Sequence, residues 1–224
     1  DCAHAPGARL GDRGCGSLGA VAAFSFFSNK NMTTGEGGML TTDDEPTAAT
    51  LRLLRSHGMT TVTWDRHRGH AFTYDVTRVG TNARMDELRA AIGRVQLRKL
   101  TAANARRAEV TAWYREGLAA RPGLADVSAP FARNAYGRGV HHLFVVLLPD
   151  GVDRAPVMAS LREHRVQSSV HYPPTHHFSA YRREGVALAV TDALAPRLLT
   201  LPLGPAMTRA HVDLVLDALA AALR

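Results

Sequence analysis

Cysteine is scarce in this chain of 224 residues, which contains only Cys2 and Cys15 and no CxxC pair. Two cysteines without that spacing exclude a disulfide framework and a zinc knuckle, and they favour a protein of the reducing cytoplasm. Long apolar runs are also lacking, because arginine, aspartate or glycine interrupts every hydrophobic stretch before the roughly 20 residues that a membrane-spanning helix needs. The sequence therefore predicts no association with a membrane.

Apolar side chains, by contrast, are plentiful. Hydrophobic residues make up 46% of the chain and charged residues 21%, a balance typical of a folded globular protein rather than a disordered one. At about 150 residues per domain, the length allows one large domain or two modest ones. The formal net charge is +7, which favours anionic partners, either nucleic acid or phosphorylated small molecules. The charge alone does not choose between them.

Hydrophobic periodicity predicts strands that alternate with helices. We expect strands over 18–27, 39–42, 143–148 and 166–171, and helices over 43–57, 86–100, 153–164, 187–199 and from 207 onward, with a second, arginine-rich helix between residues 100 and 122. This order is typical of an α/β or α+β architecture. A boundary near Leu100 predicts two domains, 1–100 and 101–224.

Lys30 lies just past the first predicted strand, in a polar loop that has three glycines in four positions. Glycines at that density indicate tight turns and close approach of the backbone to another group. A lysine held there and partly desolvated can form a Schiff base, whereas an isolated loop lysine is usually solvated. Nearby in the sequence, Ser25 offers a hydroxyl for a phosphate, and Asp1 and His4 offer a carboxylate and an imidazole.

Ordered motifs along almost the whole chain carry a resemblance to a known family. They are Asp1-Cys2-Ala3-His4-Ala5, Gly16-Ser17-Leu18-Gly19, Phe24-Ser25-Phe26-Phe27-Ser28-Asn29-Lys30-Asn31, Thr34-Gly35-Glu36-Gly37-Gly38, Leu53-Leu54-Arg55-Ser56-His57-Gly58, Asn82-Ala83-Arg84-Met85 and His171-Tyr172-Pro173-Pro174. Each motif alone is weak evidence, but the set in this order is specific. The chain resembles the pyridoxal-phosphate-dependent nucleotide-sugar aminotransferases of the DegT/StrS type.

The resemblance implies a fold-type I transferase of the α/β class. Residues 1–100 would be the remainder of its large cofactor-binding domain, and residues 101–224 a smaller α+β C-terminal domain. In the family, a further N-terminal portion holds the phosphate loop and the aromatic residue that stacks on the cofactor. We therefore expect this chain to be the C-terminal part of a larger enzyme. Either a longer precursor was trimmed, or a separate partner chain supplies the rest, or the fragment is inactive.

The resemblance also implies a role for each site residue around the cofactor, pyridoxal 5'-phosphate. Lys30 would form the Schiff base and move a proton between the substrate α-carbon and the cofactor C4′ atom. Asp1 would keep the pyridine nitrogen protonated, His4 would lie against the ring or its phenolic oxygen, and Ser25 would bind the phosphate. Asn82 would reach the cofactor phosphate of the neighbouring subunit, which implies a homodimer with shared active sites.

On the substrate side, the resemblance places His171, Tyr172 and His176 near the sugar or the nucleotide diphosphate. Residues His177 to Ser179 depart from the usual sequence of the family at this position. The departure weakens the assignment of these residues to the sugar acceptor.

Each assignment has a simpler structural reading. Asp1 could be a frayed terminus, and Ser25 could satisfy a backbone group near the end of a strand. Asn82 is a favoured residue at a helix N-cap, and the 171–176 segment could be a proline-stiffened surface turn.

Histidine pairs at His141-His142 and His176-His177 raise the question of a metal ion. A zinc site needs three or four convergent ligands, and no HxxxH or cysteine-containing spacing is present among them, so the sequence predicts no metal. The polar stretch 59–80, with His67 and His70, is expected to be an extended functional loop.

The expected reaction consists of two half-transaminations, in which an amino acid, expected to be glutamate, donates its amino group and a keto-sugar nucleotide receives it. Such a reaction belongs to deoxyaminosugar or polysaccharide biosynthesis. Two alternatives within the family are a catalytically silent or auxiliary member and a cyclitol aminotransferase. The rival from another class is a nucleic-acid-binding protein, which is disfavoured because the arginines are spread along the chain without an aromatic-interleaved basic stripe.

Overall fold

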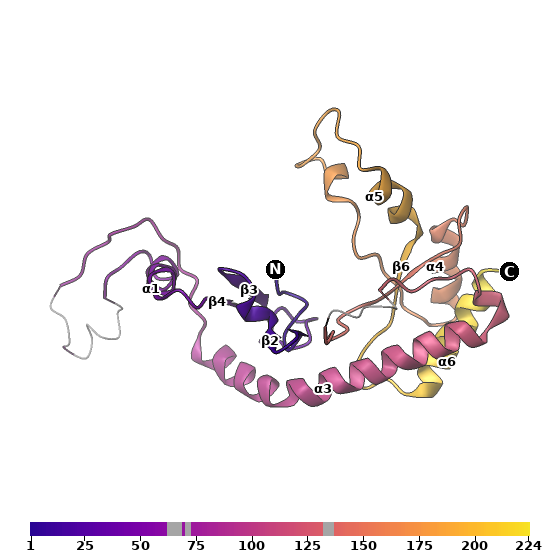
Figure 1. The fold of residues 1–224 in the computed structure, drawn as a ribbon, viewed down its shortest axis with the longest axis horizontal. Helices are drawn as coiled ribbons and strands as arrows, with labels where there is room; N and C mark the ends of the chain where they lie inside the picture. The colour runs from indigo at the N-terminus through magenta and orange to yellow at the C-terminus, as the bar shows by residue number, and fades with distance from the viewer. Residues whose placement is uncertain (62–68, 70–72, 132–136) are drawn as a thin grey trace. The chain divides into compact units, whose positions relative to one another are not determined.

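The computed structural model describes residues 1–61, 69, 73–131 and 137–224. These residues form two compact units, one comprising Asp1–Thr101 with Gly137–Gly139 and the other Ala102–Tyr136 with Val140–Arg224. Figure 1 follows the chain through its elements, from indigo at the N-terminus to yellow at the C-terminus. Within the expected loop over 59–80, His67 and His70 lie outside the described residues.

The first unit contains two short antiparallel strand pairs. β1 (Arg9–Leu10) pairs with β2 (Arg13–Gly14), and after the 3-10 turn η1 (Cys15–Ser17), β3 (Ala22–Ser25) pairs with β4 (Gly38–Thr41). The strand predicted over 18–27 is therefore shorter than expected. Ala22 is the one buried residue of β3. In the described residues β3 has a strand partner on one edge only, β4, and a two-stranded sheet of this kind leaves most of the side chains of β3 partly exposed.

Helix α1 (Glu45–Leu54) confirms the helix predicted after β4. Asp44 is its N-cap, and the carboxylate accepts a 2.8 Å hydrogen bond from the backbone N–H of Thr47. A proline in the first turn matches the preferred φ of that position. The chain leaves the helix through two residues of positive φ, His57 at 61° and Gly58 at 73°.

Helix α3 (Glu87–Ala120) is one continuous helix of 34 residues, so the prediction of two separate helices is wrong. The sequence between Leu100 and Val110 contains no proline or glycine and is rich in alanine, the strongest helix former. Nothing there interrupts the backbone hydrogen bonds. The predicted stop at Pro122 is confirmed, because the 3-10 turn η2 (Pro122–Leu124) follows the helix.

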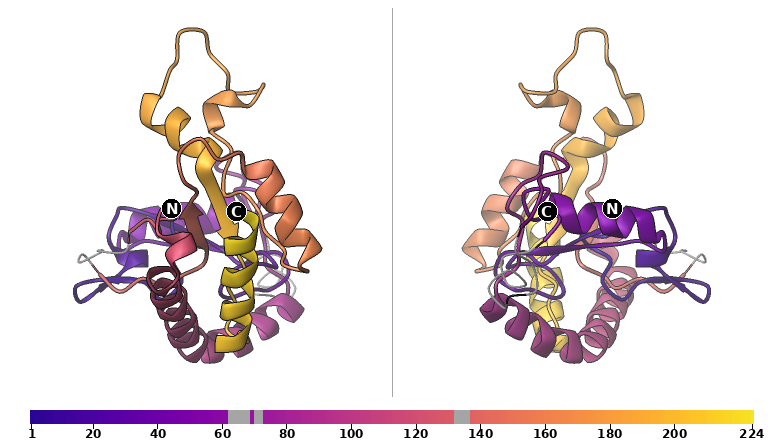
Figure 2. Two further views of the ribbon diagram at one scale, coloured as in Figure 1. Left: turned by 90° about the vertical axis from the view of Figure 1, so that its right-hand side faces the viewer. Right: turned by 90° about the vertical axis from the view of Figure 1, so that its left-hand side faces the viewer.

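The second unit is built on one antiparallel strand pair, β5 (Phe144–Leu147) with β6 (Leu198–Leu201), in which Phe144 lies opposite Leu201. Helices α4 (Arg154–Glu163) and α6 (Arg209–Ala222) pack against each other beside it (Figure 2). Side chains of these elements and of the C-terminal half of α3 form one apolar core. Its fully buried members include Val110, Tyr114, Val146, Leu161, Leu199, Val212, Leu216 and Leu219.

Two predictions for this unit are wrong. Residues 166–171 form no strand and contribute only a single bridge, between Ser169 and Thr200. The helix predicted over 187–199 is limited to α5 (Ala189–Leu194) and the 3-10 turn η4 (Ala195–Arg197), because Pro196 cannot continue an α-helix. The residues that follow become β6, whose apolar side chains are buried by pairing with β5.

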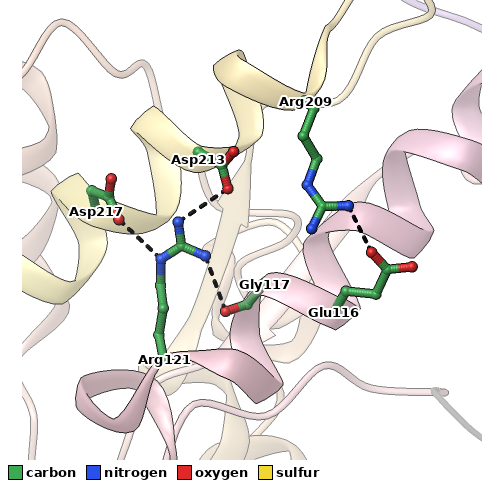
Figure 3. Close-up of polar contacts among 6 residues, drawn as sticks. All are labelled: Glu116, Gly117, Arg121, Arg209, Asp213 and Asp217. Carbon is green, nitrogen blue, oxygen red and sulfur yellow. Dashed lines mark hydrogen bonds and ion pairs between the residues drawn. The ribbon is translucent and has the colours of Figure 1, made fainter.

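Charged side chains join the end of α3 to α6 (Figure 3). Arg121 donates from Nε to Asp217 at 2.9 Å and from Nη2 to Asp213 at 3.1 Å, and a third N–H donates to the carbonyl of Gly117 at 3.2 Å. These contacts fix the two helices beside the core.

Among the described residues, no helix combines the length and the apolar character needed to cross a lipid bilayer.

Candidate functional site

The N-terminal segment lies beside β3. The backbone N–H of Cys2 donates a 2.8 Å hydrogen bond to the carbonyl of Ala23, and Cys2 is buried. This bond places the preceding residue, Asp1, at the edge of the strand. The Oδ1 atom of Asp1 accepts a 2.7 Å hydrogen bond from the backbone N–H of Ala3, which orients the exposed carboxylate. Cys2 is thus fixed against β3, whereas Asp1 itself is exposed and its carboxylate contacts the backbone of Ala3.

Ser25 is the last residue of β3 and lies opposite Gly38 of β4. Its hydroxyl accepts a 3.3 Å hydrogen bond from the backbone N–H of Phe27, so it does satisfy a backbone group, as the simpler reading expected. A Cβ atom at Gly38 would lie 2.7 Å from the carbonyl oxygen of Phe24. Only glycine allows β4 to approach β3 this closely, and the end of β3 that carries Ser25 depends on that approach.

Lys30 follows β3 on a short turn, in which its backbone N–H donates a 3.0 Å hydrogen bond to the carbonyl of Phe27. The residues that follow are buried: Asn31, Met32 and Thr34. Met32 packs with Phe26 in a small apolar cluster. The lysine itself is half-buried, and the residues that follow it hold its backbone in place.

Asn82 lies on an extended segment that forms a bridge with Ser56. The Oδ1 atom of Asn82 accepts a 2.9 Å hydrogen bond from Arg84 Nε, and the residue is exposed. The reading of Asn82 as a helix N-cap is wrong. The carboxylate of Asp86 caps α3 instead, accepting a 2.8 Å hydrogen bond from the backbone N–H of Arg89.

His171 and Tyr172 belong to the second unit, in the segment between α4 and η3 (Thr175–His177). The Nδ1 atom of His171 lies 3.2 Å from the hydroxyl of Ser169 and 3.0 Å from that of Thr200. The two rings meet edge to face with their centroids 4.8 Å apart. Two hydroxyls thus orient the His171 ring, while Tyr172 is 55% exposed.

His176 is held by a partner that sequence reasoning missed. Its Nε2 atom lies 2.8 Å from Asp192 Oδ1, and His177 Nε2 lies 3.0 Å from the same oxygen. Desolvation by itself raises the pKa of Asp192. Hydrogen bonds from His176 and Leu188 and the charges of the two imidazoles together have a larger, opposite effect, so the pKa of Asp192 lies below its ordinary value. Asp192 follows His176 by 16 positions in the sequence. No helical or strand periodicity relates two residues at this spacing, so their contact could not be predicted from the sequence.

The predicted site residues therefore form two groups, each within one unit. The cofactor group, Asp1, His4, Ser25, Lys30 and Asn82, belongs to the first unit. The substrate group, His171, Tyr172 and His176, belongs to the second.

Comparison with known proteins identifies the family. Residues 1–220 match the DegT/DnrJ/EryC1/StrS aminotransferase family. The chain belongs to that family. Its members are pyridoxal-phosphate-dependent aminotransferases of fold type I, so the family and the α/β fold class expected from the sequence are confirmed, and the expected cofactor is the one that the family uses.

The names of several similar proteins refer to sugars or to polysaccharide biosynthesis. The spore coat polysaccharide biosynthesis protein SpsC of Bacillus subtilis (strain 168) is 36% identical over 97% of this chain. DesI, solved in the presence of its TDP-sugar product, is 32% identical over the whole chain, with a TM-score of 0.85. Spr1654 of Streptococcus pneumoniae, solved in a pyridoxal-phosphate form, is 25% identical over the whole chain, also with a TM-score of 0.85.

The chain spans little more than half of the length of these aminotransferases: 57% of SpsC, 55% of DesI and 56% of Spr1654.

The donor set of the first unit fits the family cofactor. Pyridoxal phosphate needs a carboxylate partner for its ring nitrogen, hydrogen-bond donors for its phosphate and an amine for its aldehyde. Asp1 offers a carboxylate held by the Ala3 backbone N–H, Ser25 offers a hydroxyl at the end of β3, and Lys30 offers an amine on the turn that follows.

Proposed function

We propose that this chain is the part of a nucleotide-sugar aminotransferase that carries the cofactor lysine. The enzyme transfers an amino group from an amino acid, with glutamate as the expected donor, to a keto-sugar nucleotide in deoxyaminosugar or polysaccharide biosynthesis. The family match over residues 1–220 supports the reaction class. DesI, with its TDP-sugar product, supports the acceptor class.

Three side chains of the first unit take the roles that the reaction requires. Pyridoxal phosphate, when bound, supplies a ring that accepts the electrons left when the C–H bond beside the amino group breaks. Asp1 keeps the proton on the ring nitrogen, and Ser25 binds the phosphate. Lys30 would hold the cofactor through its amine, and the same amine would move a proton at the substrate α-carbon. Positioned proton transfer of this kind contributes roughly 10²–10⁴-fold to a rate.

Asn82 and the substrate group complete the proposal. Asn82 is exposed on the first unit and serves the cofactor phosphate of a neighbouring subunit, so the enzyme acts as a homodimer. His171, Tyr172 and His176 face the sugar nucleotide, whose diphosphate is attracted by the net charge of +7.

The main support for this proposal is the position of Lys30. The half-buried lysine lies on the turn that follows β3, and the residue next to Asp1, Cys2, is hydrogen-bonded to the same strand. The sequence contains only two lysines, Lys30 and Lys99. Lys99 is exposed on α3 and is therefore a matched control. The experiment is borohydride reduction of the cofactor-loaded protein, followed by peptide mass mapping.

We expect the pyridoxyl group on Lys30 and none on Lys99. Lys30→Ala should leave a folded protein, judged by circular dichroism, that has lost amino transfer, whereas Lys99→Ala should keep it. Label on Lys99 alone, or normal amino transfer by Lys30→Ala, contradicts the proposal. An unlabelled Lys30 in a folded, cofactor-saturated protein would identify a catalytically silent family member instead.

A further inference from the structure

We propose that His176, His177 and Asp192 form a binding site for a divalent transition-metal ion of the zinc class, which joins the turn η3 to helix α5. His176 also belongs to the proposed substrate group, but the argument for a metal ion rests on the geometry of these three side chains, and its test reads metal binding without amino transfer.

The three ligand atoms already converge. His176 Nε2 and His177 Nε2 lie 2.8 Å and 3.0 Å from Asp192 Oδ1, and all three residues offer ligand atoms within 4.8 Å of one another. Ligands at about 2.0–2.1 Å from a tetrahedral metal are separated from one another by about 3.4 Å. For the metal to bind, the distance between any two of the three ligand atoms would therefore change by no more than about 1.5 Å. Rotation of the side chains can produce changes of this size.

The carboxylate is oriented by the backbone. Asp192 Oδ2 accepts a 3.1 Å hydrogen bond from the backbone N–H of Leu188, at the start of α5, which directs Oδ1 toward the imidazoles. Hydrogen bonds of this type beyond the ligands orient metal-binding carboxylates and histidines. The two histidines are consecutive in η3, and their rings lie with centroids 4.3 Å apart and planes tilted by 60°.

The donor chemistry selects the ion. Two imidazoles and one carboxylate suit borderline cations such as Zn²⁺ and Co²⁺, whereas Mg²⁺ and Ca²⁺ require oxygen ligands. Three protein ligands leave a fourth position for water or another small ligand, as in open zinc sites. The side-chain exposures, 13% for His176, 35% for Asp192 and 52% for His177, leave a route for the ion from solvent.

Positive charges beside the site act against a bare cation. Arg182 and Arg183 line a hollow of about 480 Å³ together with His176 and Tyr181. The carboxylate of Asp192 offsets part of that charge, and an anionic fourth ligand would offset more. We therefore expect metal affinity to increase when a small anion such as phosphate is present.

The experiment is a titration of the cofactor-loaded protein with Co²⁺, followed by its visible d–d absorption, and then displacement with Zn²⁺. The variants are Asp192→Asn and His177→Gln, of which the second changes a half-exposed side chain and should leave the fold intact. His164→Gln is the matched control, because His164 is an exposed histidine at the end of α4 whose Nδ1 atom contacts the Ser160 carbonyl and which is not part of the cluster. Circular dichroism confirms folding of each variant.

We expect the wild type and His164→Gln to bind Co²⁺ alike, and Asp192→Asn and His177→Gln to bind it at least about tenfold more weakly. Zn²⁺ should raise the thermal midpoint of the wild type and not of His177→Gln, since an ion that binds only the native state stabilises it. Absence of the Co²⁺ spectrum in the wild type, or an equal spectrum in folded His177→Gln, overturns the proposal and leaves the three residues as an ion-pair cluster. Neither readout depends on amino transfer.

Discussion

The backbone N–H of Cys2 lies 2.8 Å from the carbonyl oxygen of Ala23, and this hydrogen bond ties the start of the chain to β3. Two residues that the sequence predicts to bind the cofactor lie close to this hydrogen bond along the backbone. Asp1 precedes the bonded residue, and Ser25 ends the bonded strand two positions later. The hydrogen bond thus brings the backbone next to Asp1 close to the end of the strand that carries Ser25, although the two residues are far apart in sequence. Lys30 lies on the turn that follows this strand.

Asp1→Asn should separate the charge of Asp1 from its structural role. The amide oxygen of asparagine can still accept the hydrogen bond from Ala3, so we expect the N-terminal backbone and cofactor binding to persist. Loss of the negative charge should lower the rate of amino transfer by about 10²-fold or more, because the ring nitrogen no longer keeps its proton. Single-turnover kinetics measure the rate, and Asp43→Asn, at an exposed position, is the control. A rate equal to the wild type would remove Asp1 from the mechanism.

Mixed dimers should show whether Asn82 acts in the neighbouring subunit. Lys30→Ala and Asn82→Ala homodimers should both be nearly inactive. In a mixture, each heterodimer would regain one intact site, so about a quarter of the wild-type activity should return for random pairing in a two-fold dimer. Activity is measured before and after subunit exchange. If Asn82 served its own subunit, no heterodimer site would be intact and the mixture would stay inactive.

Arg121→Met should weaken the second unit while preserving the packing of the side-chain stem. The variant loses ion pairs to Asp213 and Asp217, whose side chains are 42% and 70% exposed. Because solvent screens such pairs, we expect a loss of about 1 kcal/mol in the free energy of unfolding, smaller at high salt. Urea unfolding of the two proteins at low and high salt measures it. Arg209→Met removes a more exposed pair with Glu116 and should cost less; the reverse order would contradict the role given to Arg121.

His141 should make the stability of the protein decrease in acid. Burial, together with the nearby charge of Arg115, lowers the pKa of His141 below its ordinary value of 6.5. The unfolded state then binds more protons than the native state, so stability falls as pH drops below about 6.5 toward the lowered pKa. His141→Gln should reduce this dependence. Thermal unfolding of both proteins at several pH values between 5 and 8 checks the slope, and identical slopes would refute the assignment.

Helix ends with local signals were predictable from the sequence. Asp44 caps α1 and Asp153 caps α4, and each carboxylate bonds a backbone N–H in the first turn of its own helix. The apolar stripe of α6 was likewise visible, because Val212, Val215, Leu216 and Leu219 recur at helical spacing and all are buried. The family was also predictable, because the ordered motifs along almost the whole chain indicate it through residue identity and order alone, and the match over residues 1–220 confirms it.

The sequence by itself determined those helix caps and apolar stripes, because they depend on residues that are close together in the chain. It also determined the family, because the family is identified by the order of its motifs. Tertiary structure alone decided that Leu198–Leu201 is a strand, since pairing with β5 and burial in the core outweigh a helical pattern that Pro196 interrupts. It also decided that Asp192 meets His176 and His177, because an irregular segment connects η3 to α5 and such a segment has no period from which the contact could be predicted.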